Sequence, residues 1–291
     1  MTSGEGRVRC SGSGRRVGAL WYRYERSAAP YVFISPFYIL FAVFSVGPLF
    51  YAFYLSLVKW AGSGPVIFVG LRNYLDLPHD PVFVKSLFNT VYYAVGAIFV
   101  ILPGALLLAV ILNSVLVRWK GFFRTAFVMP ILTSAVAATI MFLLMFDHQY
   151  GLLNVLLQSV GLPPQHWRGE RLVKLSVLLV AAWRYIGINM LYFLAGLQSI
   201  PQDVYEAAAV DGAGRWMTFW RITLPLLRPV GLFVIIVTII GSFQFFAEPM
   251  LLAGGGPRNA SLTIANYLYR AGFQFVQMGY ASAIGSVLAL I

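Results

Sequence analysis

The chain has 291 residues, of which 59% are hydrophobic and only 11% are charged. Soluble domains carry about twice that share of charged residues, so the composition excludes an ordinary soluble protein. The formal net charge of +11 does not indicate nucleic-acid binding, because many of the arginines flank long apolar runs, where they act as topology signals. The sequence therefore predicts an all-α protein that crosses a membrane several times.

Residues 1–29 form a polar tail rich in Arg, Ser and Gly. The tail has no short apolar core with a small-residue cleavage site, so we interpret it as a cytoplasmic tail rather than a targeting peptide. Cys10 is the only cysteine of the chain, which excludes an internal disulfide. The three histidines, His79, His148 and His166, lack metal-ligand spacing, so we expect no metal site.

Six apolar runs follow the tail, and most of them are long enough to cross a bilayer. We predict membrane spans at residues 31–58, 87–112, 125–146, 175–197, 229–247 and 280–291. Pro36 and Pro48 fall inside the first run, and such kinks are tolerated in membrane helices. The last run is short for a hydrocarbon core of about 30 Å, so we expect the natural chain to continue past Ile291.

The distribution of Arg and Lys indicates the orientation. The tail, the connector between the second and third spans, and residues 198–228 are richer in basic residues than the remaining loops. Cytoplasmic loops carry such an excess, so we predict that the N-terminus and residues 198–228 lie in the cytoplasm.

Residues 198–228 contain the most distinctive pattern of the chain, EAAAVDG at 206–212 followed by ITLP at 222–225. Asp203 and Glu206 have the spacing of a capping-box variant, and the alanines that follow are strong helix formers. Gly212 permits a left-handed exit from that helix, and Pro225 is expected to end a second helical piece over residues 213–222. The pattern therefore predicts a polar helix–turn–helix block between the fourth and fifth spans.

This spacing resembles the EAA loop of the permease subunits of binding-protein-dependent ABC importers: Glu-Ala-Ala, three residues, Gly, nine residues, then Ile-x-Leu-Pro. The runs FVGLRNY (68–74) and LAGLQSIP (194–201) look like segments of the same family. The run FFAEPMLLAGGGP (245–257) and the stretch from Tyr267 to Gly285 resemble permeases for arabinose, lactose and related oligosaccharides. The resemblance covers nearly all of the chain beyond the tail.

The resemblance implies half of a translocation pathway for a sugar or oligosaccharide in a bacterial or archaeal cytoplasmic (inner) membrane. The implied partners are a second, different permease subunit, two ATP-binding subunits, an extracytoplasmic substrate-binding protein and membrane lipid. ATP and Mg would be bound by the partner ATPase, because this chain has no phosphate-binding loop of its own. We therefore expect no cofactor and no enzymatic activity in this chain. The residues implied in contact with the ATPase are Glu206, Ala207, Ala208, Asp211 and Gly212.

A substrate pathway is predicted from polar residues inside two spans. Arg184 is the one charge well inside a span, which makes it a candidate functional residue. Tyr185 and Asn189 share one helix face, and residues 238, 242, 245 and 248 share another. Hydroxyl, amide, carboxylate and aromatic groups of this kind suit a sugar. The candidates are Arg184, Tyr185, Ile188, Asn189, Thr238, Ser242, Phe245 and Glu248.

The resemblance also transfers the sugar-contact positions of the maltose permease to five of these candidates, at 185, 188, 238, 242 and 245. The residue types differ from those of that relative, so its sugar preference does not carry over. An alternative is that these polar groups only bond neighbouring helices.

Three other functions stay open at this point. The same machinery would import glycerol 3-phosphate or a glycerophosphodiester if Arg184 met a phosphate. An ion-coupled secondary transporter is less favoured, because the chain shows no repeated halves and almost no acidic residues within its spans. A membrane scaffold without transport would give no reason for the EAA spacing.

Overall fold

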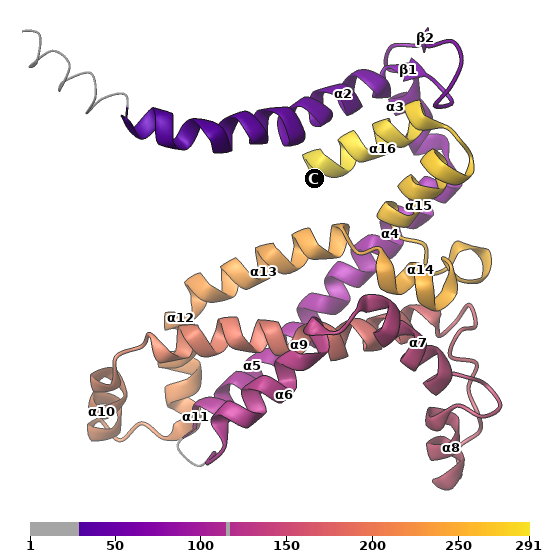
Figure 1. Ribbon diagram of the computed structural model, residues 1–291. Helices are drawn as coiled ribbons and strands as arrows, with labels where there is room; N and C mark the ends of the chain where they lie inside the picture. The colour runs from indigo at the N-terminus through magenta and orange to yellow at the C-terminus, as the bar shows by residue number, and fades with distance from the viewer. Residues whose placement is uncertain (1–28, 115–116) are drawn as a thin grey trace, which may run out of the picture. The chain divides into compact units, whose positions relative to one another are not determined.

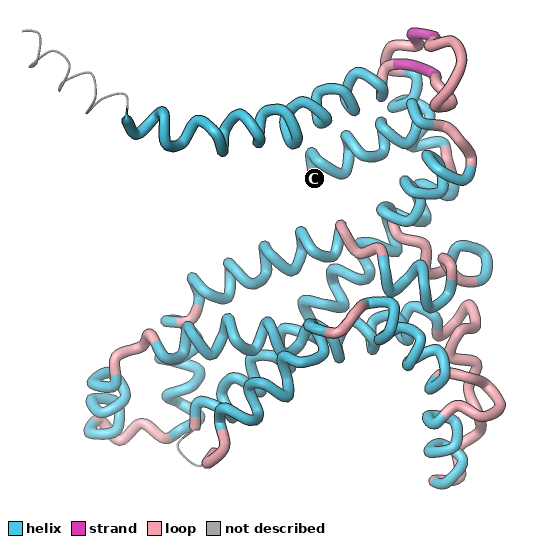
Figure 2. The backbone as a smooth tube through the Cα atoms, in the orientation of Figure 1, coloured by secondary structure: helices cyan, strands magenta, loops and turns pink. Residues whose placement is uncertain are grey.

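The computed structural model describes residues 29–114 and 117–291, so the predicted tail up to residue 28 lies outside the described residues. The structure is 76% helical with almost no strand, as the tube drawing in Figure 2 shows. This confirms the predicted all-α class of polytopic membrane protein.

The chain separates into two units, residues 1–54 and residues 55–291. The described part of the first unit is helical from Ala29 and contains a π-turn, η1 (Ala42–Val46), followed by α2 (Gly47–Ser56). The whole helix, Ala29–Ser56, has 28 residues and is apolar enough to cross a membrane. At 1.5 Å per residue it is about 42 Å long, which exceeds a hydrocarbon core of about 30 Å.

The second unit begins with a short antiparallel hairpin of β1 (Val58–Lys59) and β2 (Ile67–Phe68), in which Val58 pairs with Phe68. Two short helical turns, α3 (Arg72–Asp76) and η2 (Leu77–His79), follow the hairpin. The amide of Asn73 donates to the carbonyls of Ser56 and Val58 at 2.7 and 3.0 Å, which ties α3 to the hairpin.

One long membrane helix contains a π-turn at its middle. It consists of α4 (Pro81–Gly96), the π-turn η3 (Ala97–Ile101) and α5 (Leu102–Asn113), together 33 residues. A π-turn inserts a residue into the helical repeat and so changes the phase of the helix beyond it. α5 packs along α9 (Val173–Gln198) through the fully buried Ala105 and Ala109, and Figure 1 shows the two helices side by side.

The run predicted as a single span at 125–146 is instead two helices, α6 (Lys120–Leu132) and α7 (Ala135–Met145), bent by 94°. Pro130 lies in the last turn of α6, and prolines are a usual cause of such breaks. α6 packs tightly on α9, because Gly187 of α9 lies directly against the carbonyl of Phe127. α8 (Leu152–Ser159) follows in the loop before α9.

Beyond α9 the chain forms the loop helices and the remaining apolar helices. The loop holds α10 (Gln202–Val210), α11 (Arg215–Thr218), the π-turn η4 (Phe219–Thr223) and α12 (Leu224–Leu226). After it come α13 (Arg228–Phe243), α14 (Ala247–Ala253), η5 (Pro257–Asn259), α15 (Ile264–Tyr269), η6 (Arg270–Gln274) and α16 (Met278–Leu290).

By length and composition, three helices among the described residues can cross a membrane: Ala29–Ser56, Pro81–Asn113 and Val173–Gln198. The number rises to five if each bent pair, α6 with α7 and Arg215–Leu226 with α13, forms one span. α16 has 13 residues and is shorter than the others. The predicted count of six spans therefore stays a prediction.

Asp80 links the start of α4 to the C-terminal helices. Its carboxylate accepts hydrogen bonds from the hydroxyls of Tyr267 and Tyr280, and from the backbone N–H of Val82. Burial alone would raise the pKa of Asp80, but these hydrogen bonds together hold it below its ordinary value.

We expect Asp80→Asn to lower the melting temperature of the detergent-purified chain at pH 7, by an amount equivalent to about 1–3 kcal/mol. The folded-state pKa is depressed, so the stabilisation is present above the unfolded value of about 3.9 and is lost as pH falls through the folded value. The difference between the two proteins, followed by thermal unfolding, should therefore shrink below about pH 4. An equal difference at pH 7 and pH 3 would contradict this account.

Candidate transport cavity and coupling loop

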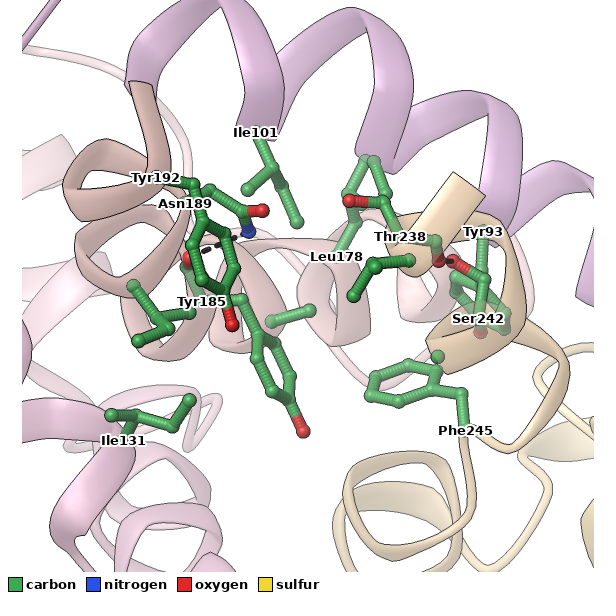
Figure 3. Close-up of a pocket in the computed structure, with 15 residues that line it drawn as sticks. Tyr93, Ile101, Ile131, Leu178, Tyr185, Asn189, Tyr192, Thr238, Ser242 and Phe245 are labelled. Carbon is green, nitrogen blue, oxygen red and sulfur yellow. Dashed lines mark hydrogen bonds between the residues drawn. The ribbon is translucent and has the colours of Figure 1, made fainter. Parts of the chain in front are cut away.

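A cavity of about 230 Å³ lies between α9, α13 and the middle of the long helix formed by α4, η3 and α5. Figure 3 shows Tyr185 and Asn189 on one wall, and Thr238, Ser242 and Phe245 on the facing wall. Tyr185 and Asn189 meet Thr238 and Ser242 because α9 and α13 each turn one face toward the other. Phe245 lies beyond the end of α13 at Phe243, and Glu248 belongs to α14, so the prediction of one helix face for residues 238, 242, 245 and 248 is wrong for the last two. Apolar groups make up most of the lining, and hydroxyl, phenol and amide groups are distributed among them.

Six of the eight candidates named from the sequence line this cavity: Tyr185, Ile188, Asn189, Thr238, Ser242 and Phe245. The polar ones are partly engaged within their own helices. Asn189 donates to the carbonyl of Tyr185 at 2.8 Å, and Ser242 donates to the carbonyl of Thr238 at 2.7 Å. Both side chains line the cavity and keep hydrogen-bonding capacity that a ligand or water can use.

Tyr93 of α4 is a lining residue that the sequence did not indicate. Its ring packs edge-on against Phe245, with the ring centres 5.5 Å apart. Its hydroxyl is buried and has no hydrogen-bond partner among the described residues. Buried polar groups are almost always bonded, so an unbonded hydroxyl on a residue of the cavity wall is unusual. One tyrosine in an apolar run gives no pattern from which this role could be predicted.

The other two candidates, Arg184 and Glu248, do not line the cavity and bind each other instead. Nη1 of Arg184 lies 2.6 Å from Oε1 of Glu248, and both side chains are buried. The phenol of Tyr185 donates to the same carboxylate oxygen at 3.3 Å. The structure thus places this charge pair beside the cavity, with Tyr185 between the pair and the cavity.

The predicted helix–turn–helix block is present between α9 and α13. Glu206, Ala207 and Ala208 lie in α10, Asp211 follows that helix, and Gly212 has a φ of +76° in the turn. Glu206, Ala207, Asp211 and Gly212 are exposed, whereas Ala208 is buried within the chain. The end of α10 and the turn after it therefore present four of the five predicted contact residues to the surroundings.

The capping-box interpretation of Asp203 and Glu206 is wrong. α10 begins at Gln202 after Pro201, which supplies no side-chain cap, so Asp203 lies inside the first turn. Glu206 instead accepts a hydrogen bond from the side-chain amide of Gln202 at 2.8 Å. The second helical piece also continues past Pro225, because it runs from Arg215 to Leu226 before the 65° bend into α13.

A cavity of about 430 Å³ separates the block from the ends of α5 and α9. The phenol of Tyr205 on α10 accepts a hydrogen bond from the hydroxyl of Thr223 at 3.3 Å, which joins the two halves of the block. The block is thus an internally bonded unit connected to the membrane helices at its two ends.

Comparison with known proteins identifies the class. Residues 101–291 match the family described as "Binding-protein-dependent transport system inner membrane component". The match covers well over half of the chain, so this protein belongs to that family and is a multi-pass membrane protein.

Three relatives of known name are similar over nearly the whole chain. The arabinooligosaccharides transport system permease protein AraP of Bacillus subtilis is 42% identical, over 92% of this chain and 86% of the relative. The lactose transport system permease protein LacF of Rhizobium radiobacter is 35% identical, over 90% and 89%. The sn-glycerol-3-phosphate transport system permease protein UgpA of Agrobacterium fabrum is also 35% identical, over 92% of each chain.

Solved structures show the same fold. A chain from the crystal structure of a bacterial ABC transporter involved in the import of the acidic polysaccharide alginate superposes with a TM-score of 0.80. Its sequence is 25% identical, and the match covers 94% of each chain. A second structure, of a bacterial alginate ABC transporter in complex with an alginate pentasaccharide-bound periplasmic protein, gives a TM-score of 0.79 at 24% identity, over 93% of each chain.

Proposed function

We propose that this chain is the permease subunit of an ATP-driven importer and forms half of the translocation pathway for a neutral sugar or oligosaccharide. The observation that carries the proposal is the cavity between α9 and α13. Its lining combines aromatic rings with hydroxyl and amide groups, and none of the lining residues is charged. Sugar hydroxyls need donors and acceptors, and the apolar face of a sugar ring packs on an aromatic ring. The relatives named for arabinooligosaccharides and lactose support the same class of cargo.

A second candidate cargo is glycerol 3-phosphate or a glycerophosphodiester, as the UgpA relative suggests. A phosphate needs a cation or several N–H donors. Arg184, which directly precedes the lining residue Tyr185, is already bound to Glu248. A neutral cargo therefore fits the lining better than an anionic one.

We further propose the assembly. The chain pairs with a second permease subunit, and an extracytoplasmic substrate-binding protein delivers the cargo. The alginate transporter of similar fold, which was solved with a periplasmic protein bound, supports the second part. Two ATP-binding subunits, which bind ATP and Mg, lie on the cytoplasmic side and contact residues 206–212. Closure of the ATPase pair then moves the helix–turn–helix block as a rigid unit. The N-terminal tail and residues 198–228 are cytoplasmic, and the spans follow the six predicted runs, with the third formed by the bent pair of α6 and α7.

The experiment is ATP-dependent uptake by the complete complex in proteoliposomes, with arabinotriose, lactose and glycerol 3-phosphate compared as radiolabelled cargo. We expect uptake of a sugar that requires ATP and the binding protein and that survives dissipation of ion gradients. Uptake driven by an ion gradient alone would show a secondary transporter. If the complex takes up glycerol 3-phosphate and neither of the two sugars, the assignment of a neutral sugar as cargo is wrong.

Within this complex, Tyr93→Phe tests the cavity with little change of shape. The unpaired hydroxyl would donate to a cargo oxygen, so its removal is expected to raise the KM for uptake by roughly 3- to 10-fold, equivalent to one neutral hydrogen bond. The melting temperature should stay the same or rise, because an unsatisfied buried group is removed. The control is Tyr92→Phe, one residue earlier on an exposed face. An equal rise in KM for both variants would count against the cavity.

A further inference from the structure

The buried ion pair of Arg184 and Glu248 is not accounted for by the transport cavity. Arg184 is 7% exposed, Glu248 is 1% exposed, and the two belong to different helices, α9 and α14. Burying two charges costs free energy that their attraction often fails to recover, and apolar replacements of such pairs are frequently as stable. In a membrane segment the cost is higher still, so charged residues there usually serve function.

The guanidinium of Arg184 joins three elements at one point. Besides its ion pair with Glu248 on α14, its Nη2 donates to the carbonyl of Thr133 at 3.4 Å. Thr133 lies in the break between α6 and α7, where the helical hydrogen-bond ladder is interrupted. Broken helices at membrane depth persist only where side chains or water satisfy the freed backbone groups. Arg184 therefore fastens that break to α9 and α14.

The carboxylate of Glu248 also holds the cavity wall on the α9 side. Tyr185 donates its phenol to Oε1 of Glu248, and the guanidinium of Arg184 lies 5.5 Å from the centre of the Tyr185 ring. The ring of a cavity-lining residue is thus fixed by both members of the pair. Tyr185 cannot turn away from this position without losing both contacts.

The wall on the α13 side is held in the segment between α13 and α14. Phe245, which lines the cavity, precedes Glu248 by three residues. The carbonyl of Phe245 accepts from the hydroxyl of Thr263 at 2.8 Å, and that of Phe246 accepts from the amide of Asn266 at 2.9 Å. These bonds fix one side of the segment, and the ion pair anchors its other end to α9.

We propose that Arg184 and Glu248 are positioning residues of the transport cavity. Their ion pair sets the distance between Tyr185 and Phe245, and neither residue contacts the cargo. The inference rests on the proposed function only for what the cavity carries, since the geometry of the pair is independent of the cargo. The proposal also gives a reason for a buried charged pair at this place: the pair fixes the shape of the cavity, whether or not it stabilises the fold.

The first test reports the shape of the cavity without any cargo. In a Cys10→Ser background, Ser242→Cys places a single thiol on the lining, and its rate of modification by a charged methanethiosulfonate reagent is measured in the purified complex. Arg184→Met and Glu248→Met are each expected to change this rate by about 10-fold, and the double variant should return to within about 2-fold of the parent. Glu248→Gln, which keeps the shape of the side chain and one hydrogen bond, should change the modification rate less than Glu248→Met does. The control thiol, Val160→Cys, is 71% exposed directly after α8, outside the surface assigned to the ATPase, and should not respond.

The second test separates positioning from cargo contact by uptake of arabinotriose. Each single variant should raise the KM by about 10-fold with a smaller change in the maximal rate, and the double variant should recover most of the loss. A double variant as impaired as Arg184→Met would show that Arg184 binds cargo directly and would overturn the proposal. Unchanged thiol modification in both single variants would overturn it as well. If the parent complex takes up no sugar, the cargo assignment fails. The rates of thiol modification in the single and double variants then still decide whether Arg184 and Glu248 are positioning residues.

Discussion

Gly212→Asp is expected to abolish ATP-driven uptake while the protein still inserts into the membrane at its normal level. Gly212 has a φ of +76°, and a Cβ placed there would meet no atom within 4 Å. The effect is therefore one of backbone conformation and charge rather than collision. A non-glycine residue in this conformation costs about 1–2 kcal/mol, and the new carboxylate would stand beside Asp211 on the surface that we assign to the ATPase. Uptake and stimulated ATPase activity of the reconstituted complex measure the result.

The chain supplies a matched control two residues further on. Gly214 has a φ of −69°, precedes α11 and also has open space where a Cβ would be added. Aspartate is favoured at such a helix start, so Gly214→Asp adds the same charge without backbone strain. We expect it to retain most of the uptake. Gly212→Asn, which is neutral and tolerates the left-handed region better, should fall between the two.

Glu206→Lys reverses the exposed charge on α10 and is expected to uncouple the complex as well. The change removes the carboxylate that accepts from Gln202 but should leave α10 helical, because Lys is as good a helix former as Glu. Normal uptake by both Glu206→Lys and Gly212→Asp would refute the assignment of residues 206–212 to the ATPase contact.

Gly187→Ala is expected to cost the folded chain about 3 kcal/mol, at the upper end for overpacking. A Cβ on Gly187 would overlap the carbonyl oxygen of Phe127, which is backbone and has no free rotation to escape. α6 would have to move away from α9, and the contact at the 94° break would be lost. Thermal unfolding in detergent, followed by size-exclusion chromatography, should show a markedly lower melting temperature.

Gly231→Ala is the comparison for that experiment. Gly231 lies in α13 with no atom within 4 Å of an added Cβ. Alanine is the better helix former, so this variant should be as stable as the parent or more stable by up to about 1 kcal/mol. Equal behaviour of the two alanine variants would mean that α6 and α9 are not in close contact.

Much of the fold follows from the sequence, because apolar runs of sufficient length can only be helices in a membrane. Part of the cavity lining could be predicted from helical periodicity. Tyr185 and Asn189, and likewise Thr238 and Ser242, are four residues apart, so each pair must share a helix face. That the two faces meet is visible only in three dimensions, although the family resemblance pointed to several of the same positions.

The features that the sequence did not reveal depend on contacts between distant residues. Arg184 and Glu248 are 64 residues apart, and a single sequence gives no sign of their pairing. The 94° break follows Pro130, but prolines inside apolar runs are often accommodated in a continuous membrane helix, so Pro130 alone was not sufficient to predict it. The capping box failed because Pro201 moved the start of α10 forward, so that Asp203 became an interior residue.

The π-turn Ala97–Ile101 determines where the long helix of α4, η3 and α5 can lose or gain a residue. Ala97 and Ile101 line the cavity, while Ala105 and Ala109 just beyond them pack against α9. Five residues of a π-turn rotate the chain about as far as four residues of α-helix do, so removing one residue from the turn would restore a regular helix and leave α5 in its present phase. Removing one residue from the flanking turns of α4 or α5 would instead rotate everything after it by about 100°. The two alanines would then leave α9, and bulkier neighbours would take their place. A one-residue deletion should therefore be tolerated better within this turn than in the regular helix on either side of it.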